Sequence, residues 1–366
     1  MARINLGLLV LVFVVGGLAG CKPQMQADLS PDGRTVALTD DRGLVLRDVA
    51  GKQPDTLIRL DEARSPQFSP DGKWIVIEHS EFAVLVERVS GKLVKLPLIS
   101  PPFAWKPDSS ELVGVRDNTA LVVHIPSRTV VRSYKLLEKP QFAVWLGDGR
   151  DMAFSSIHKL MSIHDGALSS RTTDRFISVL GVDRSRRKVV WAESLGQPVN
   201  PFMVNLDSVR RRTIGFPRSE FLIKESALSF KEEPTQIGKA TLADSLGSKG
   251  RLSVPASISI SPDGSHLAFL GIVDSSEPGL MEKYADLGGF NQDGLSAAAN
   301  RRLRQMEKQM RFQTVCTTLE IGVPAKPPTK LMTRPNVSLN SASSWSEDGQ
   351  TLAIVFGDEV ITKKVP

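Results

Sequence analysis

Seven aspartates recur along this chain, and carboxylates repeated in this way could bind a metal ion or act as general acids and bases. Successive members lie 39, 37, 40, 35, 80 and 85 residues apart. Several stand in Pro-Asp-Gly, where proline fixes φ, aspartate bonds to nearby backbone and glycine adopts a left-handed conformation. These residue types predict hairpin turns rather than a catalytic or metal site. The turn residues are Asp32, Gly33, Asp71, Gly72, Asp108, Asp148, Gly149, Asp183, Asp263, Gly264, Asp348 and Gly349.

The other residues that could carry chemistry form no compact motif. The five histidines fall in different columns of the repeat and include no His-Glu-x-x-His, so no shared metal site is expected. No Gly-x-Ser-x-Gly elbow, phosphate-binding glycine loop or dinucleotide fingerprint occurs, and no cofactor is expected. Catalysis stays open, because propeller enzymes assemble their sites from loops of several blades.

Each aspartate turn joins two short apolar runs, and a third and a fourth run follow in most copies. Four short strands repeated about every forty residues are typical of an all-β propeller. The Ser-Pro-Asp-Gly repeats resemble those of TolB-type, WD-repeat-like propellers over most of residues 26–366. Counting a degenerate unit between Glu220 and Val254, we expect about eight four-stranded blades; the alternative is seven, with that segment elaborating its neighbours. The last unit provides only three strands.

The N-terminal segment is expected to lie outside the fold. Residues 1–20 have the basic start, apolar run and small residues of a signal peptide. Leu18-Ala19-Gly20-Cys21 resembles the lipobox of bacterial lipoproteins, which implies acylation of Cys21 and a short tether over residues 21–25. The alternatives are a plain secretory signal and an uncleaved anchor. The resemblance implies a propeller, residues 26–366, held at a membrane.

One helical insertion, residues 273–313, interrupts the seventh repeat. An apolar stripe along its longer helix is flanked by basic residues, so the helix either packs on the propeller or contacts a membrane or a partner protein. The basic residues are Arg301, Arg302, Arg304, Lys308 and Arg311.

A second basic cluster is expected at one face of the ring. Arg184, Arg186, Arg187 and Lys188 lie in a first turn, and Arg210, Arg211 and Arg212 are placed in or beside the third turn of the same blade. First and third turns open on one face of a propeller. The cluster is either a solvated charge run or a site for an anion or an acidic partner.

These features predict a lipid-anchored, non-catalytic protein that uses its propeller as a binding platform for an envelope or periplasmic protein. The alternative is a lyase or hydrolase that acts on a glycan or peptide at the mouth of the central channel. Nucleic acid is not an expected partner. Lys22 after the acylated cysteine resembles the sorting signal for the outer membrane of Gram-negative bacteria, on its periplasmic side.

Overall fold

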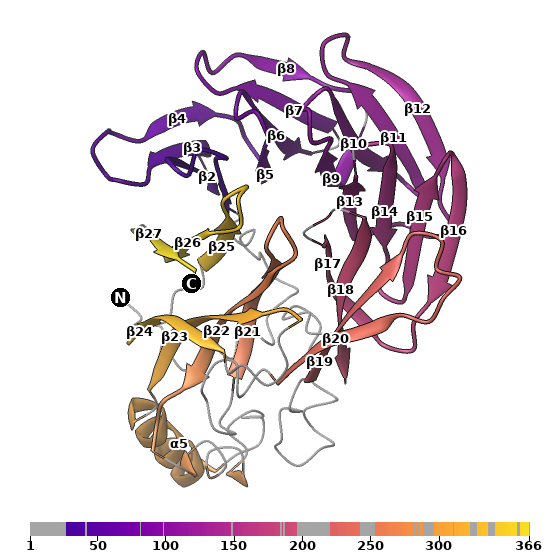
Figure 1. Ribbon diagram of the computed structural model, residues 1–366. Coiled ribbons are helices and arrows are strands. Elements are labelled where there is room, and N and C mark those ends of the chain that lie inside the picture. Colours follow the sequence, from indigo (N-terminus) through magenta and orange to yellow (C-terminus); the bar gives the residue numbers. More distant parts are fainter. Residues whose placement is uncertain are drawn as a thin grey trace.

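The computed structural model describes residues 27–366 apart from several gaps. The longer gaps are 196–219, 242–252, 288–295, 323–327 and 336–340, and the shorter ones are 41, 81, 98, 148, 184, 186, 278, 281–282, 284–285, 310, 357–358 and 366. The described chain forms seven antiparallel sheets arranged as the blades of a propeller (Figure 1). In each sheet the strands follow one another in chain order, with the first strand innermost.

The first four sheets have four strands each. They are β1 (Ala27–Leu29), β2 (Thr35–Asp40), β3 (Gly43–Asp48) and β4 (Thr56–Arg59); β5 (Ala63–Phe68), β6 (Trp74–His79), β7 (Phe82–Glu87) and β8 (Leu93–Lys95); β9 (Ser100–Trp105), β10 (Glu111–Arg116), β11 (Thr119–His124) and β12 (Thr129–Lys135); and β13 (Phe142–Leu146), β14 (Asp151–Ser155), β15 (Lys159–His164) and β16 (Ala167–Thr172).

The remaining sheets complete the ring. They are β17 (Phe176–Val182), β18 (Lys188–Leu195), β19 (Glu220–Ala227) and β20 (Thr235–Thr241); β21 (Ser253–Ile260), β22 (His266–Asp274), β23 (Phe312–Glu320) and β24 (Thr329–Arg334); and the three-stranded β25 (Ser341–Trp345), β26 (Thr351–Phe356) and β27 (Glu359–Lys364). The three-stranded last sheet is as the sequence predicted.

The all-β propeller is confirmed, with the alternative count of seven sheets rather than eight in the described chain. The segment from Glu220 forms no blade of its own, because β19 pairs with β18 along all eight of its residues and β20 pairs with β19. A long connection between β18 and β19 had concealed that these strands belong to one sheet. The helical insertion consequently lies in the sixth sheet, between β22 and β23, and not in a seventh repeat.

The apolar runs of the strands are explained by burial on both sides of each sheet. In the first sheet, Ala37 and Leu44 pack against the second sheet, whereas Val36 and Val45 pack against Ala353 and its neighbours in the last sheet. Alternate side chains of one strand therefore enter different interfaces. This is why the middle strands read as continuous apolar sequences rather than as alternating ones.

Tryptophans three residues before the turn aspartate link neighbouring inner strands. Trp145 Nε1 donates a 2.8 Å hydrogen bond to the carbonyl oxygen of Ala104 in the preceding sheet. Trp345 Nε1 donates similarly to Ser259 Oγ at 3.0 Å. This column of the repeat thus connects blades as well as filling the core.

The chain order divides the connections between two faces of the ring. We call the edge with the first and third connections of each sheet the turn face. The opposite edge, with the second connections and the links between sheets, is the link face. Ala27 begins β1 at the link face, since the first turn follows Leu29 at the other end of that strand.

Candidate functional site

The recurring aspartates lie in turns that are closed by their own hydrogen bonds. Ser30 Oγ donates to Asp32 Oδ1 at 2.5 Å, and Asp32 Oδ1 also accepts from the backbone N of Arg34 at 3.1 Å. The serine oxygen accepts in turn from the backbone N of Thr35 at 2.9 Å, and Gly33 closes the turn with φ of +68°. Ser69, Ser261 and Ser346 occupy the same place in their turns.

The buried serine two residues before the aspartate is a feature that sequence reasoning missed. Its signal was the repeated Ser-x-Asp spacing, although the third, fourth and fifth copies lack the serine. Burial works to raise the pKa of Asp71, but hydrogen bonds from Ser69 and Lys73 outweigh it and hold that pKa below its usual value. The pKa values of Asp32, Asp108, Asp183 and Asp348 are also held below the usual value by hydrogen bonds, against the opposing effect of burial. Asp148 lies outside the described residues.

Neighbouring turns also contact one another around the turn face. The backbone N of Asp71 donates to Ser109 Oγ in the next sheet at 3.0 Å. A Cβ on Gly264 would lie 2.1 Å from the carbonyl oxygen of Val182, and Gly264 has φ of +67°. Only glycine satisfies both requirements at this position.

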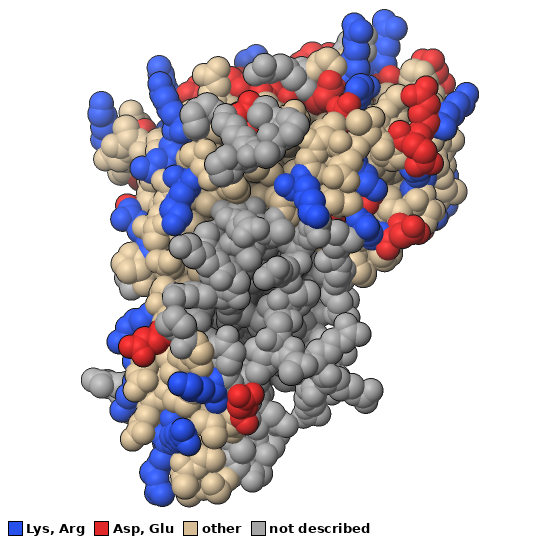
Figure 2. Space-filling view, turned by 60° about the horizontal axis from the view of Figure 1, so that its bottom comes forward, with Lys and Arg blue, Asp and Glu red and all other residues tan. Residues whose placement is uncertain are grey.

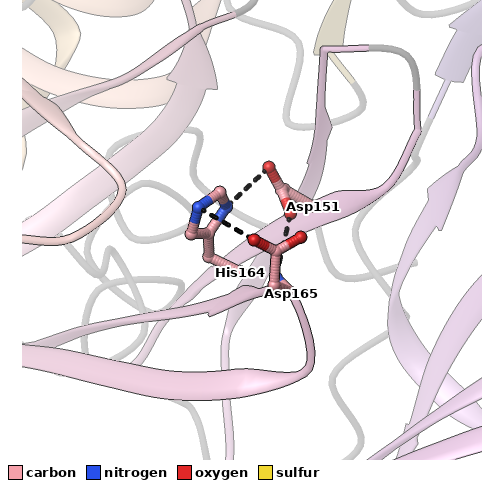
Figure 3. Close-up of side chains that lie close together, drawn as sticks. All are labelled: Asp151, His164 and Asp165. Atoms are coloured by element: carbon pink, nitrogen blue, oxygen red, sulfur yellow. Dashed lines mark hydrogen bonds and ion pairs between the residues drawn. The ribbon is translucent and has the colours of Figure 1, made fainter.

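A cluster of one histidine and two aspartates lies at the turn face of the fourth sheet (Figure 3). His164 Nδ1 is 2.9 Å from Asp151 Oδ2, and His164 Nε2 is 3.6 Å from Asp165 Oδ2. The hydrogen bond with Asp151 raises the pKa of His164 above its ordinary value, because it favours the charged imidazolium. These groups include ligand types that bind divalent cations, but each carboxylate faces a different ring nitrogen. The arrangement is therefore that of an exposed ion-pair network.

Asp151 is far enough in sequence from His164 and Asp165 that no motif joins the three residues. Asp151 begins β14, and His164 ends the neighbouring strand β15. The adjacent residues Met152 and Ile163 pair directly in these two strands. The hairpin register therefore places Asp151 across from His164, a signal that was readable once the strands had been aligned.

A partly buried carboxylate lies where the ring closes. Asp28 Oδ2 accepts from the backbone N of Phe68 in the second sheet at 2.6 Å, and Asp28 Oδ1 accepts from Ser344 Oγ in the last sheet at 2.7 Å. Ser344 Oγ also accepts from the backbone N of Leu29 at 3.0 Å. Burial raises the pKa of Asp28 to about 7, although these hydrogen bonds oppose the shift. One side chain thus joins three consecutive sheets of the ring.

Two residues of the expected basic cluster lie among the described residues. Arg187 and Lys188 are exposed at the turn face, and Lys188 Nζ bonds to Glu225 Oε1 at 2.5 Å, which raises the pKa of Lys188. Arg184 and Arg186, like Arg210, Arg211 and Arg212, lie outside the described residues.

The second group of arginines was assigned to the wrong connection. Residues 210–212 belong to the segment between β18 and β19, which is the second connection of the fifth sheet and not the third. Lys188 pairs with Ala227 at one end of these strands, and Leu195 pairs with Glu220 at the other end. The two groups are therefore attached at opposite edges of the sheet.

Three long connections leave the fifth and sixth sheets at their link-face edge. Residues 196–219 and 275–311 form the second connections of these sheets, and residues 242–252 link one sheet to the other. The first connections, such as residues 30–34 and 261–265, are tight turns. The longest connections thus all begin and end at this edge of the fifth and sixth sheets.

The helix α5 (Ala297–Gln309) lies within the second of these connections. Leu303 and Met306 on its apolar side are buried, and Leu280 and Leu287 of the same insertion pack against them. Arg301, Arg302, Arg304 and Lys308 are exposed on its remaining surface, as is Arg311 just after it. Figure 2 shows basic side chains gathered at this end of the molecule with few acidic ones among them. Leu295 and Met310, the apolar residues just before and just after the helix, lie outside the described residues.

The two cysteines differ in what can be said of them. Cys21, the expected acylation site, lies outside the described residues together with the rest of residues 1–26. Cys316 is a free, buried thiol in β23, and burial raises its pKa to about 12. Among the described residues, no helix is both long enough and apolar enough to cross a membrane.

The fold defines the class of protein as a seven-bladed β-propeller. No protein-family model matches the chain, and no curated protein matches it. Among solved structures it is similar to a chain of Kuenenia stuttgartiensis hydrazine synthase, with a TM-score of 0.60, 14% identity, and 94% of this chain and 97% of that chain covered.

Two further solved structures have the same architecture. A chain from a mitotic checkpoint complex has a TM-score of 0.55 and 11% identity over 95% of this chain and 92% of that chain. The β-propeller domain of Myceliophteria thermophila Cps50 (Swd1) has the same TM-score and identity over 95% of this chain and 98% of that chain. These likenesses establish the propeller fold alone.

Proposed function

We propose that this protein is a lipid-anchored, non-catalytic propeller that binds a partner protein of the cell envelope through the link face. The observation that supports the proposal is that the three longest connections, residues 196–219, 242–252 and 275–311, all begin and end at the link-face edge of the fifth and sixth sheets. Binding residues of many proteins lie on loops that a rigid scaffold positions. The seven packed sheets supply that scaffold.

The lipid anchor in this proposal depends on the lipobox that ends at Cys21. Five residues separate Cys21 from Ala27, and the six steps from one to the other, at about 3.4 Å per extended residue, span roughly 20 Å. Acylation would therefore hold the link face, where β1 begins, near the membrane. In a Gram-negative source, Lys22 favours the periplasmic side of the outer membrane.

Catalysis at the mouth of the central channel is the competing function. It requires polar groups that converge on a substrate, whereas both carboxylate oxygens of the inner-strand residue Asp28 are directed to Phe68 and Ser344. Hydrazine synthase, one of the similar structures, is named as an enzyme, but 14% identity extends only the fold to this chain.

The test removes one long connection without disturbing the sheet that carries it. Leu195 and Glu220 lie directly opposite each other, so Asn-Gly in place of residues 196–219 would form a two-residue hairpin. In the native envelope, crosslinking of the intact lipoprotein followed by mass spectrometry should recover a partner, and this variant should lose it at normal abundance.

The matched control changes the opposite face. Replacing exposed turn-face residues Arg34, Lys52 and Lys92 by glutamine should leave the crosslinks unchanged. Recovery of the same partner at the same yield from the shortened variant would refute the proposal, and so would failure to recover any protein from the unmodified chain.

A further inference from the structure

We infer that the basic surface of α5 rests on anionic phospholipid headgroups and so orients the propeller, with its link face toward the membrane and its turn face away from it. This inference deepens the proposed function and rests on its lipid anchor. It assigns α5 a role in orientation, because an acylated N-terminus alone leaves the propeller free to tilt about its short tether.

The first observation is that the apolar side of α5 is covered and its basic side is exposed. Its apolar residues Leu303 and Met306 are covered by leucines of the same insertion. The exposed surface is therefore polar, and Arg301, Arg302, Arg304 and Lys308 take part in none of the ion pairs formed among the described residues. A surface of this kind matches a headgroup layer by charge rather than by insertion.

The second observation is where α5 is attached. β22 ends at Asp274 and β23 begins at Phe312, and these two residues pair directly. The backbone N of Ser275 donates to the carbonyl oxygen of Arg311 at 2.8 Å, and Ser276 Oγ accepts from the backbone N of Arg311 at 2.7 Å. The insertion is therefore fastened at its base to the link-face end of the sixth sheet.

The third observation is the length of chain before β1. Ala27 begins β1 at the link face, and five residues lie between it and Cys21. An acyl chain on Cys21 would bring that same face within roughly 20 Å of the bilayer. The anchor and the basic helix therefore belong to one face, which favours a membrane over an acidic protein as the occupant.

The size of the effect follows from the charges. Each lysine or arginine near an anionic leaflet contributes about a fivefold gain in binding, and salt screens the contribution over about 10 Å at 0.1 M. Because the four residues cannot all approach the surface equally, we expect at least a tenfold loss of the oriented state when all four are neutralised.

The experiment reads orientation in the full, acylated chain. Cys316 is buried, so a cysteine introduced at the exposed residue Gln305 of α5 or at Gln53 on the turn face can be labelled selectively with a fluorophore. The labelled protein is reconstituted in vesicles that carry headgroup quenchers. One set of vesicles is phosphatidylcholine, and the other contains about 30% phosphatidylglycerol, an anionic fraction chosen to set up the surface potential that basic residues sense.

We expect the label at position 305 to be quenched on the anionic vesicles. Quenching should be weaker on phosphatidylcholine vesicles, which carry no net charge, and in 0.5 M salt, which screens charges within a few ångströms. The label at position 53 should stay unquenched. The combined variant Arg301→Gln, Arg302→Gln, Arg304→Gln and Lys308→Gln should lose the quenching. A control variant with Arg34, Lys52, Lys92 and Arg128 of the turn face changed to glutamine should keep it.

Equal quenching on both lipids, or quenching that survives the α5 variant, would overturn the inference. Quenching that needs added envelope protein would overturn it in favour of an acidic protein partner. Failure of the proposed function is measured separately. If mass spectrometry shows no acyl group on Cys21, the proposed lipid anchor is refuted. Cosedimentation of the unacylated protein with the same vesicles then tests the binding of α5 to lipid by itself.

Discussion

Replacing Asp28 by asparagine is expected to stabilise the propeller above pH 7 and to leave its stability nearly unchanged near pH 4.5. Asp28 joins the first, second and last sheets through Phe68 and Ser344, and burial raises the pKa of its carboxyl from 3.8 to about 7. Asparagine keeps the size of the side chain. Its carbonyl can accept from Phe68, and its amide can donate to Ser344 in place of the protonated acid.

The sign follows from proton linkage. Between about pH 4 and pH 7 the folded chain holds a proton on Asp28 that the unfolded chain releases, so the free energy of unfolding falls as pH rises through this range. Above both pKa values the loss is complete. Three pKa units correspond to a ceiling of about 4 kcal/mol, and because Asp28 keeps partial contact with solvent we expect a gain of about 2 kcal/mol for Asp28→Asn at pH 8.5.

The assay is urea unfolding of the purified protein, followed by circular dichroism and tryptophan fluorescence, at pH 4.5, 6, 7 and 8.5. The midpoint of Asp28→Asn should move above that of the unmodified protein as pH rises, with an unchanged dependence on urea concentration. Asp32→Asn is the control, because hydrogen bonds and Arg88 lower the pKa of Asp32 despite the opposing effect of burial. Its contribution to stability is lost only below pH 4, so its effect should not vary over this range.

One result would refute the reasoning about Asp28. If Asp28→Asn destabilised the protein by the same amount at every pH, the carboxylate would be ionised throughout and its two hydrogen bonds would be net stabilising. The pKa of about 7 would then be wrong. An ionised Asp28, rather than a protonated one, would join the first, second and last sheets.

Two further predictions concern the turn face. Gly264→Ala should lower the free energy of unfolding by about 2 kcal/mol or more, because the added Cβ would lie 2.1 Å from a backbone oxygen. Gly33→Ala is the control: its Cβ would meet nothing within 4 Å, so it should cost only about 1 kcal/mol of backbone strain. Equal losses of stability in thermal unfolding would contradict this prediction. Asp151→Asn should return the pKa of His164 toward its ordinary value, since it removes the hydrogen bond that raises it; an unchanged midpoint in an NMR titration would contradict the assignment.

Local pattern was enough to predict the architecture. Each aspartate turn stood between apolar runs, and the two-sided burial of middle strands such as β2 and β26 explains why those runs were continuous. The number of blades was harder to predict. Residues 196–219 separate the second and third strands of the fifth sheet, and a repeat that is split in this way reads as two repeats.

Polar contacts between sheets were the other feature that the sequence did not reveal. Ser344 bonds to Asp28 across 316 positions of sequence, and no local pattern marks such a pair. The contact between Asp151 and His164 is different in kind, because hairpin register alone brings them together. The misplacement of Arg210, Arg211 and Arg212 had the same origin as the miscount of blades, since both depended on where β19 begins.

The way the ring closes also sets the order in which the protein can fold. No strand is exchanged between the first and last sheets in the described chain. They meet through side chains such as Leu29, Val36, Ala353 and Val355, and through the hydrogen bond that the backbone N of Leu29 donates to Ser344 Oγ. These partners lie at opposite ends of the propeller sequence, and closing so long a loop is entropically costly and slow. A chain still emerging from a ribosome therefore carries an open apolar flank on its first sheet until β25 and β26 have been made. During that interval the protein is most exposed to proteases and to aggregation.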